Sequence, residues 1–324
     1  MFPAGTDLSR PLVLHDGDLD GLGAAAIVGE RLPGATFLTP PKGTNAWGPE
    51  VRSLLDQRGP SALAVLDLGL KAAPVLDGVP SLYVDHHLAE GRPPGTVHSG
   101  LDDDPVPTTS LLSWRLFGTP QNAWRAALGN AADLGPSDPD LDAARKSQTI
   151  KAFDAAKSLL GTAKRCADPD AAVPAALRVL LANENCKAIL ADPSPDAELL
   201  RHHKEVVKAE MEIAKRAAPK FGAGPVAEIR ISSPCRIHPL LAQRWATQLP
   251  KHVALVANDG YLPGRVNFSA RTRSGVSIVA LLREAGDALG FDHPEYGHGH
   301  AAASGGSLPT EDFRRLLETW GLVP

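Results

Sequence analysis

The first 133 residues alternate short apolar runs with segments typical of helices. The apolar runs are residues 12–14 (LVL), 35–38 (ATFL), 62–66 (ALAVL) and 81–84 (SLYV). Because apolar and polar positions do not alternate within them, these runs predict strands that are buried on both faces of a parallel sheet. The stretches GAAAIVGERL and PEVRSLLDQRG between them predict helices. We therefore expect residues 1–139 to form a doubly wound α/β domain.

The pattern changes after this domain. Residues 140–222 are rich in Ala, Leu, Lys and Glu, with prolines between helical blocks, and they predict a helical connector. Its strongest block is residues 196–220, which carries Leu199, Val206 and Ile213 at seven-residue intervals. Residues 223–324 return to strand patterns (AEIRI, HVALVAND, GRVNFSAR), followed by a helix around VSIVALLREAG, a Gly-rich loop and a last helix. They predict a second, smaller α/β domain.

Composition places the chain among soluble folded proteins, with 43% hydrophobic and 22% charged residues. No apolar run is long enough to span a membrane and the first residues lack a signal-peptide pattern, so we expect a cytoplasmic protein without a membrane partner. The three cysteines have no C-x-x-C spacing and predict neither disulfides nor a thiolate zinc site.

The formal net charge of −4 argues against a basic surface that grips long duplex nucleic acid. Residues 228–283 nevertheless hold eight Lys or Arg against two acids. A basic half beside a carboxylate-rich half would suit a phosphate clamp and a metal site, although charge alone is more typical of a solvated face.

Acidic or imidazole clusters follow the apolar runs. They are HDGDLD (15–20), Asp67, DHH (85–87) and, further along, Asp133. One such aspartate would commonly be a helix cap, but the carboxyl ends of parallel strands meet at one edge of a sheet, where four clusters could converge. Converging carboxylates repel one another unless cations neutralise them, so the sequence predicts a site for hard divalent ions. It contains no G-x-x-x-x-G-K-[ST] loop and no G-x-S-x-G nucleophile motif.

The order of these clusters resembles that of the DHH phosphoesterase superfamily, which includes RecJ-like exonucleases, nanoRNases and cyclic-dinucleotide phosphodiesterases. Asp18-Leu19-Asp20-Gly21 matches the first motif, Asp67 the second, Asp85-His86-His87 the third and Asp133 the fourth. The resemblance implies two divalent metal ions, expected to be Mn²⁺ with Mg²⁺ as the alternative. It assigns one ion to Asp18 and Asp67, and the other to Asp67, Asp20, His86 and Asp133. Asp67, Asp85 and His87 would be the catalytic residues, with His87 on the substrate phosphate.

Many relatives carry a histidine four residues before the first motif aspartate, where this chain has Leu14. Asp16, in a D-x-D-x-D-G arrangement similar to that of RecJ-like proteins, is the candidate replacement ligand. His15 is the weaker candidate, because adjacent side chains of a strand point to opposite faces.

The stretch GHGHAAASGG (297–306) is similar to the Gly-Gly-Gly-His motif of the DHHA1 substrate-binding domain. His300 takes the histidine place and Gly299 precedes it, with His298 interrupting the glycine run. The resemblance implies that Arg271 and Arg273 also bind substrate. The candidate substrate residues of this region are Arg271, Arg273, Gly299, His300, Gly305 and Gly306, with His298 as a weaker candidate. The alternative interpretation of residues 297–306 is a glycine turn that leads into the last helix and binds no substrate.

We therefore expect a phosphodiesterase that hydrolyses short or single-stranded oligonucleotides with metal-activated hydroxide. Short substrates are favoured because only 5% of residues are aromatic, which is few for stacking many successive bases. Cyclic or linear dinucleotides and nucleoside bisphosphates are alternative substrates. A non-catalytic nucleotide- or RNA-binding module is the alternative outside enzymes, and a homodimer is one option for assembly.

Overall fold

The computed structural model describes residues 2–133, 135–291 and 296–322. Contacts divide the chain into two compact units, of which the first comprises Met1–Lys164 and Asp168–Lys204. The second comprises Arg165–Ala167 and Glu205–Pro324. Most of the expected connector therefore groups with the first sheet, and the three-part division of the sequence stays a prediction.

The first unit contains a five-stranded sheet in the order β2-β1-β3-β4-β5, in which every neighbouring pair is parallel. The strands are β1 (Pro11–His15), β2 (Thr36–Leu38), β3 (Ala62–Leu66), β4 (Ser81–Asp85) and β5 (Thr96–Ser99). The first four confirm the strands expected from the apolar runs. Strand β5 was not expected, because TVHS is a partly exposed edge strand without an apolar run.

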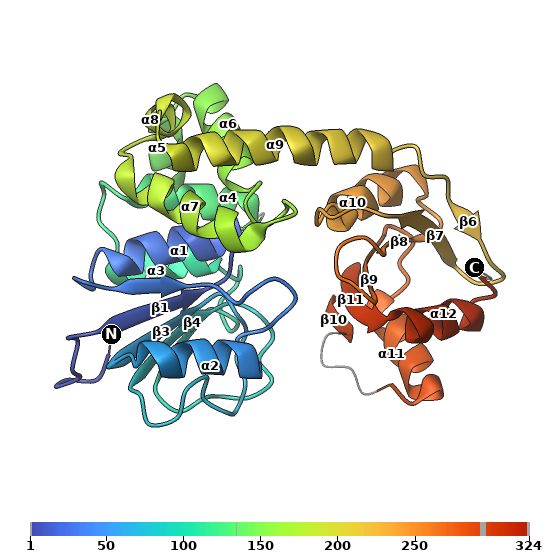
Figure 1. Cartoon of the computed structure of the whole chain (residues 1–324), viewed down its shortest axis with the longest axis horizontal. Helices are drawn as coiled ribbons and strands as arrows, with labels where there is room; N and C mark the ends of the chain where they lie inside the picture. The colour runs from blue at the N-terminus through green and yellow to red at the C-terminus, as the bar shows by residue number, and fades with distance from the viewer. Residues whose placement is uncertain (1, 134, 292–295, 323–324) are drawn as a thin grey trace. The chain divides into compact units, whose positions relative to one another are not determined.

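Helices cover both faces of this sheet (Figure 1). On one face, Val51 and Leu55 of α2 (Pro49–Arg58) pack with Leu12, Leu63 and Tyr83 of the strands. The opposite face carries α1 (Leu19–Gly29) and α3 (Thr109–Phe117). The remaining helices of this unit are α4 (Ala123–Ala132), α5 (Pro139–Ser147), α6 (Ile150–Leu160), α7 (Pro169–Ala182) and α8 (Cys186–Ala191). This arrangement confirms the α/β fold expected for the first domain.

Helix α9 (Pro195–Ala214) begins in the first unit and ends in the second. It is shorter than the helix expected over residues 196–220, because Lys220 and Phe221 form a strand instead. Its buried stripe contains Leu200, Val207 and Ala214, whereas Ile213 is 62% exposed. The seven-residue spacing was therefore correct, but the buried positions lie one residue later. None of the described helices combines the length and apolarity that crossing a membrane requires.

The second unit contains a six-stranded sheet in the order β10-β11-β9-β8-β7-β6. Its elements are β6 (Lys220–Phe221), β7 (Val226–Ile231), α10 (His238–Gln248), β8 (Val253–Asn258), β9 (Arg265–Thr272), α11 (Ile278–Leu289), β10 (Tyr296–His300), β11 (Ala303–Pro309) and α12 (Thr310–Thr319). Only β7 and β8 pair in parallel. The core packs α11 and α12 against the sheet. The expected Gly-rich loop at 297–306 is wrong, because β10 and β11 form an antiparallel pair there.

Candidate metal centre

Three of the four expected clusters lie at the carboxyl ends of β1, β3 and β4 in the first unit, whereas Asp133 lies at the end of helix α4. The backbone N–H of Asp16 donates to the carbonyl of Leu66 at 3.1 Å, and that of Asp67 donates to Val84 at 3.1 Å. These bonds continue the parallel ladder past the strands and bring the following loops together. Gly21 allows the first turn of α1 to join them, since a Cβ there would lie 2.4 Å from the carbonyl oxygen of Asp16.

Three side chains from three segments form one group around His86. Its Nε2 lies 3.5 Å from Oδ1 of Asp67, 3.5 Å from Oδ2 of Asp133 and 3.9 Å from Oδ2 of Asp20. These distances exceed ordinary N–H···O hydrogen bonds. Ligand atoms that share one ion at bonds of roughly 2.1 Å lie about 3.0–3.4 Å apart in octahedral or tetrahedral shells, so the contacts at 3.5 Å are close to that spacing and the contact to Asp20 at 3.9 Å is longer. The geometry therefore fits a cation between imidazole and carboxylates.

Asp20 is held at the beginning of α3. It accepts hydrogen bonds from the backbone N–H groups of Thr109 at 2.8 Å and Ser110 at 3.0 Å, and also from the Ser110 hydroxyl. The positive end of the helix dipole offsets part of its charge. Burial nevertheless raises the pKa of Asp20 to about 7, with help from the charge of Asp18. Thr109 and Ser110 were not predicted as site residues, although the T-T-S run is a helix-start signal.

Asp67 occupies the centre of the site. Its φ of +63° lies in the left-handed region, which aspartate tolerates better than most residues. Its Oδ1 accepts a hydrogen bond from the Thr109 hydroxyl at 2.9 Å. Burial raises its pKa well above the usual range, and the neighbouring charges of Asp20 and Asp18 raise it further. A buried carboxylate among like charges is what a cation would stabilise.

A second group contains Asp16, Asp18 and Asp67, whose oxygens can lie within 4.8 Å of one another. Lys164 forms an ion pair with Oδ2 of Asp16 and lies 3.4 Å from Oδ2 of Asp18. Burial raises the pKa of Asp18, but Lys164 outweighs this effect and holds it below the usual range. Lys164 was not predicted, because its position far along the chain carries no motif.

His15 does not join either group. Its Nδ1 lies 2.7 Å from the carbonyl oxygen of Asp16, and its ring packs edge-on against Phe37. Burial lowers its pKa to about 4. This orientation is the one expected from strand alternation, and it leaves Asp16 as the candidate ligand at this end of the site.

Asp85 and His87 form a supporting pair. Asp85 accepts hydrogen bonds from the backbone N–H groups of Gly69 at 2.8 Å and His87 at 2.7 Å, and lies 3.3 Å from Nδ1 of His87. Burial lowers the pKa of His87, but Asp85 outweighs it and raises the pKa to about 9. The His87 side chain is 51% exposed, so it is accessible to a ligand.

The site thus carries more negative than positive charge. The pKa values of Asp20, Asp67 and Asp133 are all raised, in each case by burial first and by neighbouring carboxylates next. Hard divalent ions accept mixed carboxylate and imidazole ligation. The residues present therefore fit divalent cations.

The second unit places the other candidates along neighbouring strands. Arg271 of β9 and His300 of β10 both pair with Ala303 of β11, which puts the two backbones in one row. Arg271 is half-buried and donates to the carbonyl of Ala270 at 3.2 Å, while Arg273 is exposed. Gly299 of β10 pairs with Ser304 of β11, and Gly305 and Gly306 also lie in β11. The side chains of His298 and His300 lie outside the described residues.

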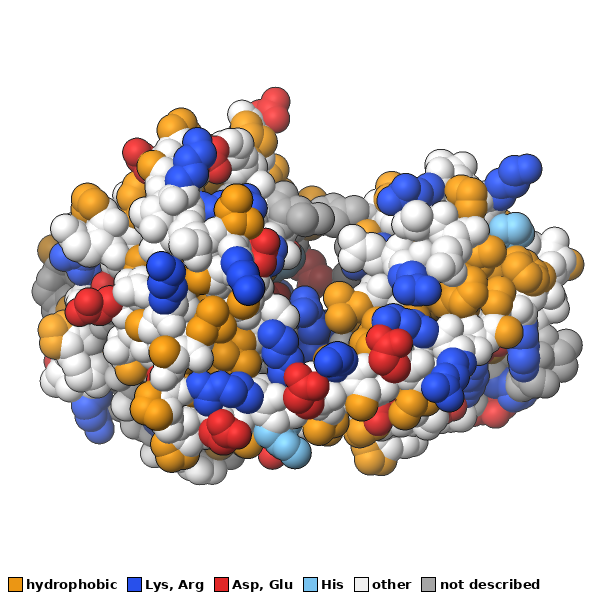
Figure 2. Space-filling model, turned by 90° about the horizontal axis from the view of Figure 1, so that it is seen from above, with side chains coloured by type: hydrophobic (Ala, Val, Ile, Leu, Met, Phe, Trp, Pro, Cys, Tyr) orange, Lys and Arg blue, Asp and Glu red, His pale blue; other side chains and the backbone are white. Residues whose placement is uncertain are grey.

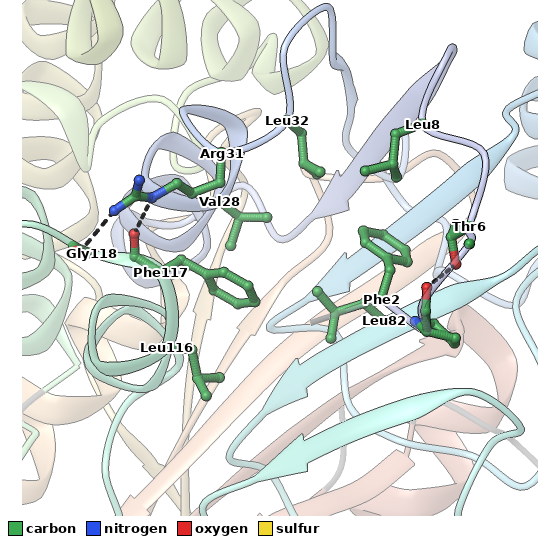
Figure 3. A pocket seen from close by; sticks show the side chains of 12 residues that line it. Phe2, Thr6, Leu8, Val28, Arg31, Leu32, Leu82, Leu116, Phe117 and Gly118 are labelled. Carbon is green, nitrogen blue, oxygen red and sulfur yellow. Dashed lines mark hydrogen bonds between the residues drawn. The ribbon is translucent and has the colours of Figure 1, made fainter.

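A separate cavity of about 480 Å³ lies near the amino ends of the strands in the first unit. Figure 3 shows its apolar lining, which includes Phe2, Leu8, Leu32 and Leu116. Arg31 donates to the Phe117 carbonyl at 2.7 Å and to the Gly118 carbonyl at 3.4 Å. The cavity contains none of the candidate residues, so the acidic site is the better candidate for chemistry.

The solved structures that resemble this chain share its fold. No family model and no curated protein matches the sequence. Among solved structures, RecJ of Thermus thermophilus in complex with Mn²⁺ has a TM-score of 0.66 at 19% identity, covering 97% of this chain and 52% of RecJ. An exonuclease RecJ bound to manganese has a TM-score of 0.61 at 20% identity, covering 97% and 91%.

A third structure is PggH, a pGpG-specific phosphodiesterase from Vibrio cholerae. It has a TM-score of 0.52 at 14% identity, with 96% of this chain and 97% of PggH covered. The chain spans about half the length of the Thermus thermophilus RecJ, but nearly all of the other two proteins. The possible homodimer receives no support from these findings. The chain therefore has a fold like that of the RecJ structures.

Proposed function

We propose that this chain is a divalent-metal-dependent phosphodiesterase that acts on short or single-stranded oligonucleotides. One observation carries the proposal: Asp20, Asp67 and Asp133 come from three separate segments and bring carboxylate oxygens within 3.5–3.9 Å of Nε2 of His86. Manganese is the expected ion, with magnesium as the alternative. The RecJ structures with Mn²⁺ and Mg²⁺ support a divalent cation in this fold.

In this proposal two neighbouring cation positions share Asp67. Asp16 and Asp18 would complete one position, while Asp20, His86 and Asp133 would complete the other. Divalent ions held there would activate a water for in-line attack and offset negative charge on the scissile phosphate. Thr109 orients the shared carboxylate, and Ser110 orients that of Asp20.

His87 is our candidate for contact with the scissile phosphate. Asp85 holds its Nδ1, which leaves the other ring nitrogen for a phosphate oxygen. Its half-exposed side chain can meet a substrate without displacing a core residue. Asp85 itself is buried and bonded to two backbone N–H groups, so we assign it a positioning role.

The second unit is our candidate for choosing the substrate. Arg271 and His300 share a row of the sheet, and a phosphate remote from the scissile bond is the group that guanidinium and imidazole would hold. Lys and Arg side chains are scattered among acidic and apolar ones on the face in Figure 2. The net charge of −4 favours short substrates over long duplexes.

The second candidate function is hydrolysis of a cyclic or linear dinucleotide or of a nucleoside bisphosphate. The similarity in fold to PggH over nearly the full length of both chains favours it. The same cation positions would serve these substrates, and a nucleotide-binding module without turnover is the remaining alternative.

Hydrolysis by the chelated and reconstituted protein tests the proposal. A pentanucleotide, a linear dinucleotide, a cyclic dinucleotide and a nucleoside 3′,5′-bisphosphate are compared with Mn²⁺, Mg²⁺ or chelator. We expect turnover only with a divalent ion, and a loss of about 100-fold in kcat/KM for His86→Gln because a ligand is removed. His202→Gln, at an exposed histidine of α9, is the matched control and should be unchanged. Full activity in chelator, or in His86→Gln, would contradict the proposal.

A further inference from the structure

The two cation positions are not equivalent in this chain. The position around His86 combines one imidazole with Asp20, Asp67 and Asp133, and the ion pairs of these three carboxylates are made with His86 and His87. The position formed by Asp16, Asp18 and Asp67 has carboxylates alone. There the neighbouring cationic group is the ammonium of Lys164.

No imidazole is available to the carboxylate position from the preceding strand. Leu14 is fully buried in the core, and the His15 ring is occupied by the Asp16 carbonyl and by Phe37. A neutral histidine ligand would leave this position with its full negative charge and therefore with its full attraction for a metal ion. A lysine ammonium instead neutralises one charge and occupies the carboxylate oxygens that the ion would need.

Lys164 lies close to these carboxylates, and their loop packs on the helix that follows it. Its ammonium bridges Asp16 and Asp18, which flank Gly17. A Cβ on Gly17 would lie 2.9 Å from Cγ2 of Val173, so the loop of these aspartates packs directly on α7. Lys164 lies in the turn between α6 and α7, and this turn is therefore tied to the loop through charge and through packing.

We propose that Lys164 is a built-in competitor of the divalent cation at Asp16, Asp18 and Asp67. The position around His86 then binds its ion tightly, and the carboxylate position fills only when the ammonium is displaced. The four-carbon stem of lysine allows that displacement without movement of the backbone. The inference rests on the proposed metal-dependent function, and it makes this chain a one-ion protein at low metal and a two-ion protein at high metal.

Manganese titration of the chelated protein tests the inference. Calorimetry gives the number and affinity of ions, and electron paramagnetic resonance distinguishes a single Mn²⁺ from a spin-coupled pair. For the wild type we expect one tight ion and a second that binds at least tenfold more weakly, with the coupled signal only at high manganese. Lys164→Met should tighten the second ion at least tenfold without changing the first, and Lys164→Arg should keep it weak.

Lys157→Met is the matched control, since it removes the same charge from α6 at an ion pair with Asp154. It should leave both affinities unchanged. Equal affinities in the wild type, or an unchanged second affinity in Lys164→Met, would overturn the inference while leaving the metal site itself intact. Failure of the wild type to bind any manganese would instead reject the proposed function. If Lys164→Met does not fold, Lys164→Gln and the wild-type titration decide in the same way.

Discussion

Asp67→Asn should raise the stability of the metal-free protein while removing most of the stabilisation by manganese. Asparagine tolerates the left-handed φ of +63° and keeps an oxygen for the Thr109 hydroxyl, so the backbone and this hydrogen bond persist. What changes is the charge. The substitution removes a buried carboxylate whose pKa is raised by burial and by neighbouring carboxylates.

The size of the effect follows from the distances. Oxygens of Asp16, Asp18 and Asp67 lie within 4.8 Å of one another, and two like charges at that separation repel by about 3 kcal/mol at an effective dielectric constant of ~20. Lys164 offsets part of this repulsion. We therefore expect a net gain of about 1–3 kcal/mol in chelator, which corresponds to a rise in Tm of roughly 3–9 °C for a unit of this size.

With manganese most of this difference should disappear. A ligand at 100 times its dissociation constant stabilises the native state by about 2.7 kcal/mol, and Asp67→Asn should lose most of that gain because both positions share Asp67. Differential scanning calorimetry in chelator and in MnCl₂ measures both arms, with Asp56→Asn at an exposed site on α2 as the control. The reasoning fails if Asp67→Asn lowers Tm in chelator or keeps the full manganese shift.

Two further predictions concern the second unit. Burial lowers the pKa of His238 to about 3, and its Nδ1 has no hydrogen-bond partner among the described residues, so the folded state favours the neutral ring. The unfolded chain takes up this proton below about pH 6.5, so this contribution to stability is complete above that pH and decreases by about 2 kcal/mol at pH 5. Denaturant titrations at pH 8 and 5 should show a decrease about 2 kcal/mol larger in the wild type than in His238→Phe, because other buried groups such as His15 titrate alike in both. Arg271→Ala should raise KM for a dinucleotide at least tenfold yet leave a small activated phosphodiester unchanged, and equal losses on both substrates would place Arg271 at the scissile phosphate or in folding.

The first sheet was predicted well because strands buried on both faces of a parallel sheet consist of consecutive apolar residues. The runs at 12–14 and 62–66 needed no knowledge of distant partners, and the motif aspartates follow them directly. Strand β5 was missed because its residues are partly exposed at the edge of the sheet. The β10–β11 pair was missed because glycine has little intrinsic strand preference, and pairing with β9 supplies what local sequence lacks.

The partners of the site residues were harder to predict than the residues themselves. Ser110 reaches Asp20 across 90 positions of the chain, and Lys164 reaches Asp16 across 148. Neither contact follows from a local pattern, since each depends on how helices pack above the sheet. Motifs therefore identified the candidate ligands, while the groups that neutralise and orient them emerged only from the fold.

This separation between ligands and their partners bears on how the site can work. Asp20 is stabilised by the fixed N–H groups at the start of α3, which stay in place whether or not an ion is bound. Asp16 is stabilised by a flexible side chain that an ion must displace. A rigid partner keeps one position ready for its ion, whereas a mobile charged partner makes occupancy of the other depend on metal concentration. In-line hydrolysis with two ions needs both positions. Occupancy of the position formed by Asp16, Asp18 and Asp67 should therefore set the metal concentration at which turnover begins.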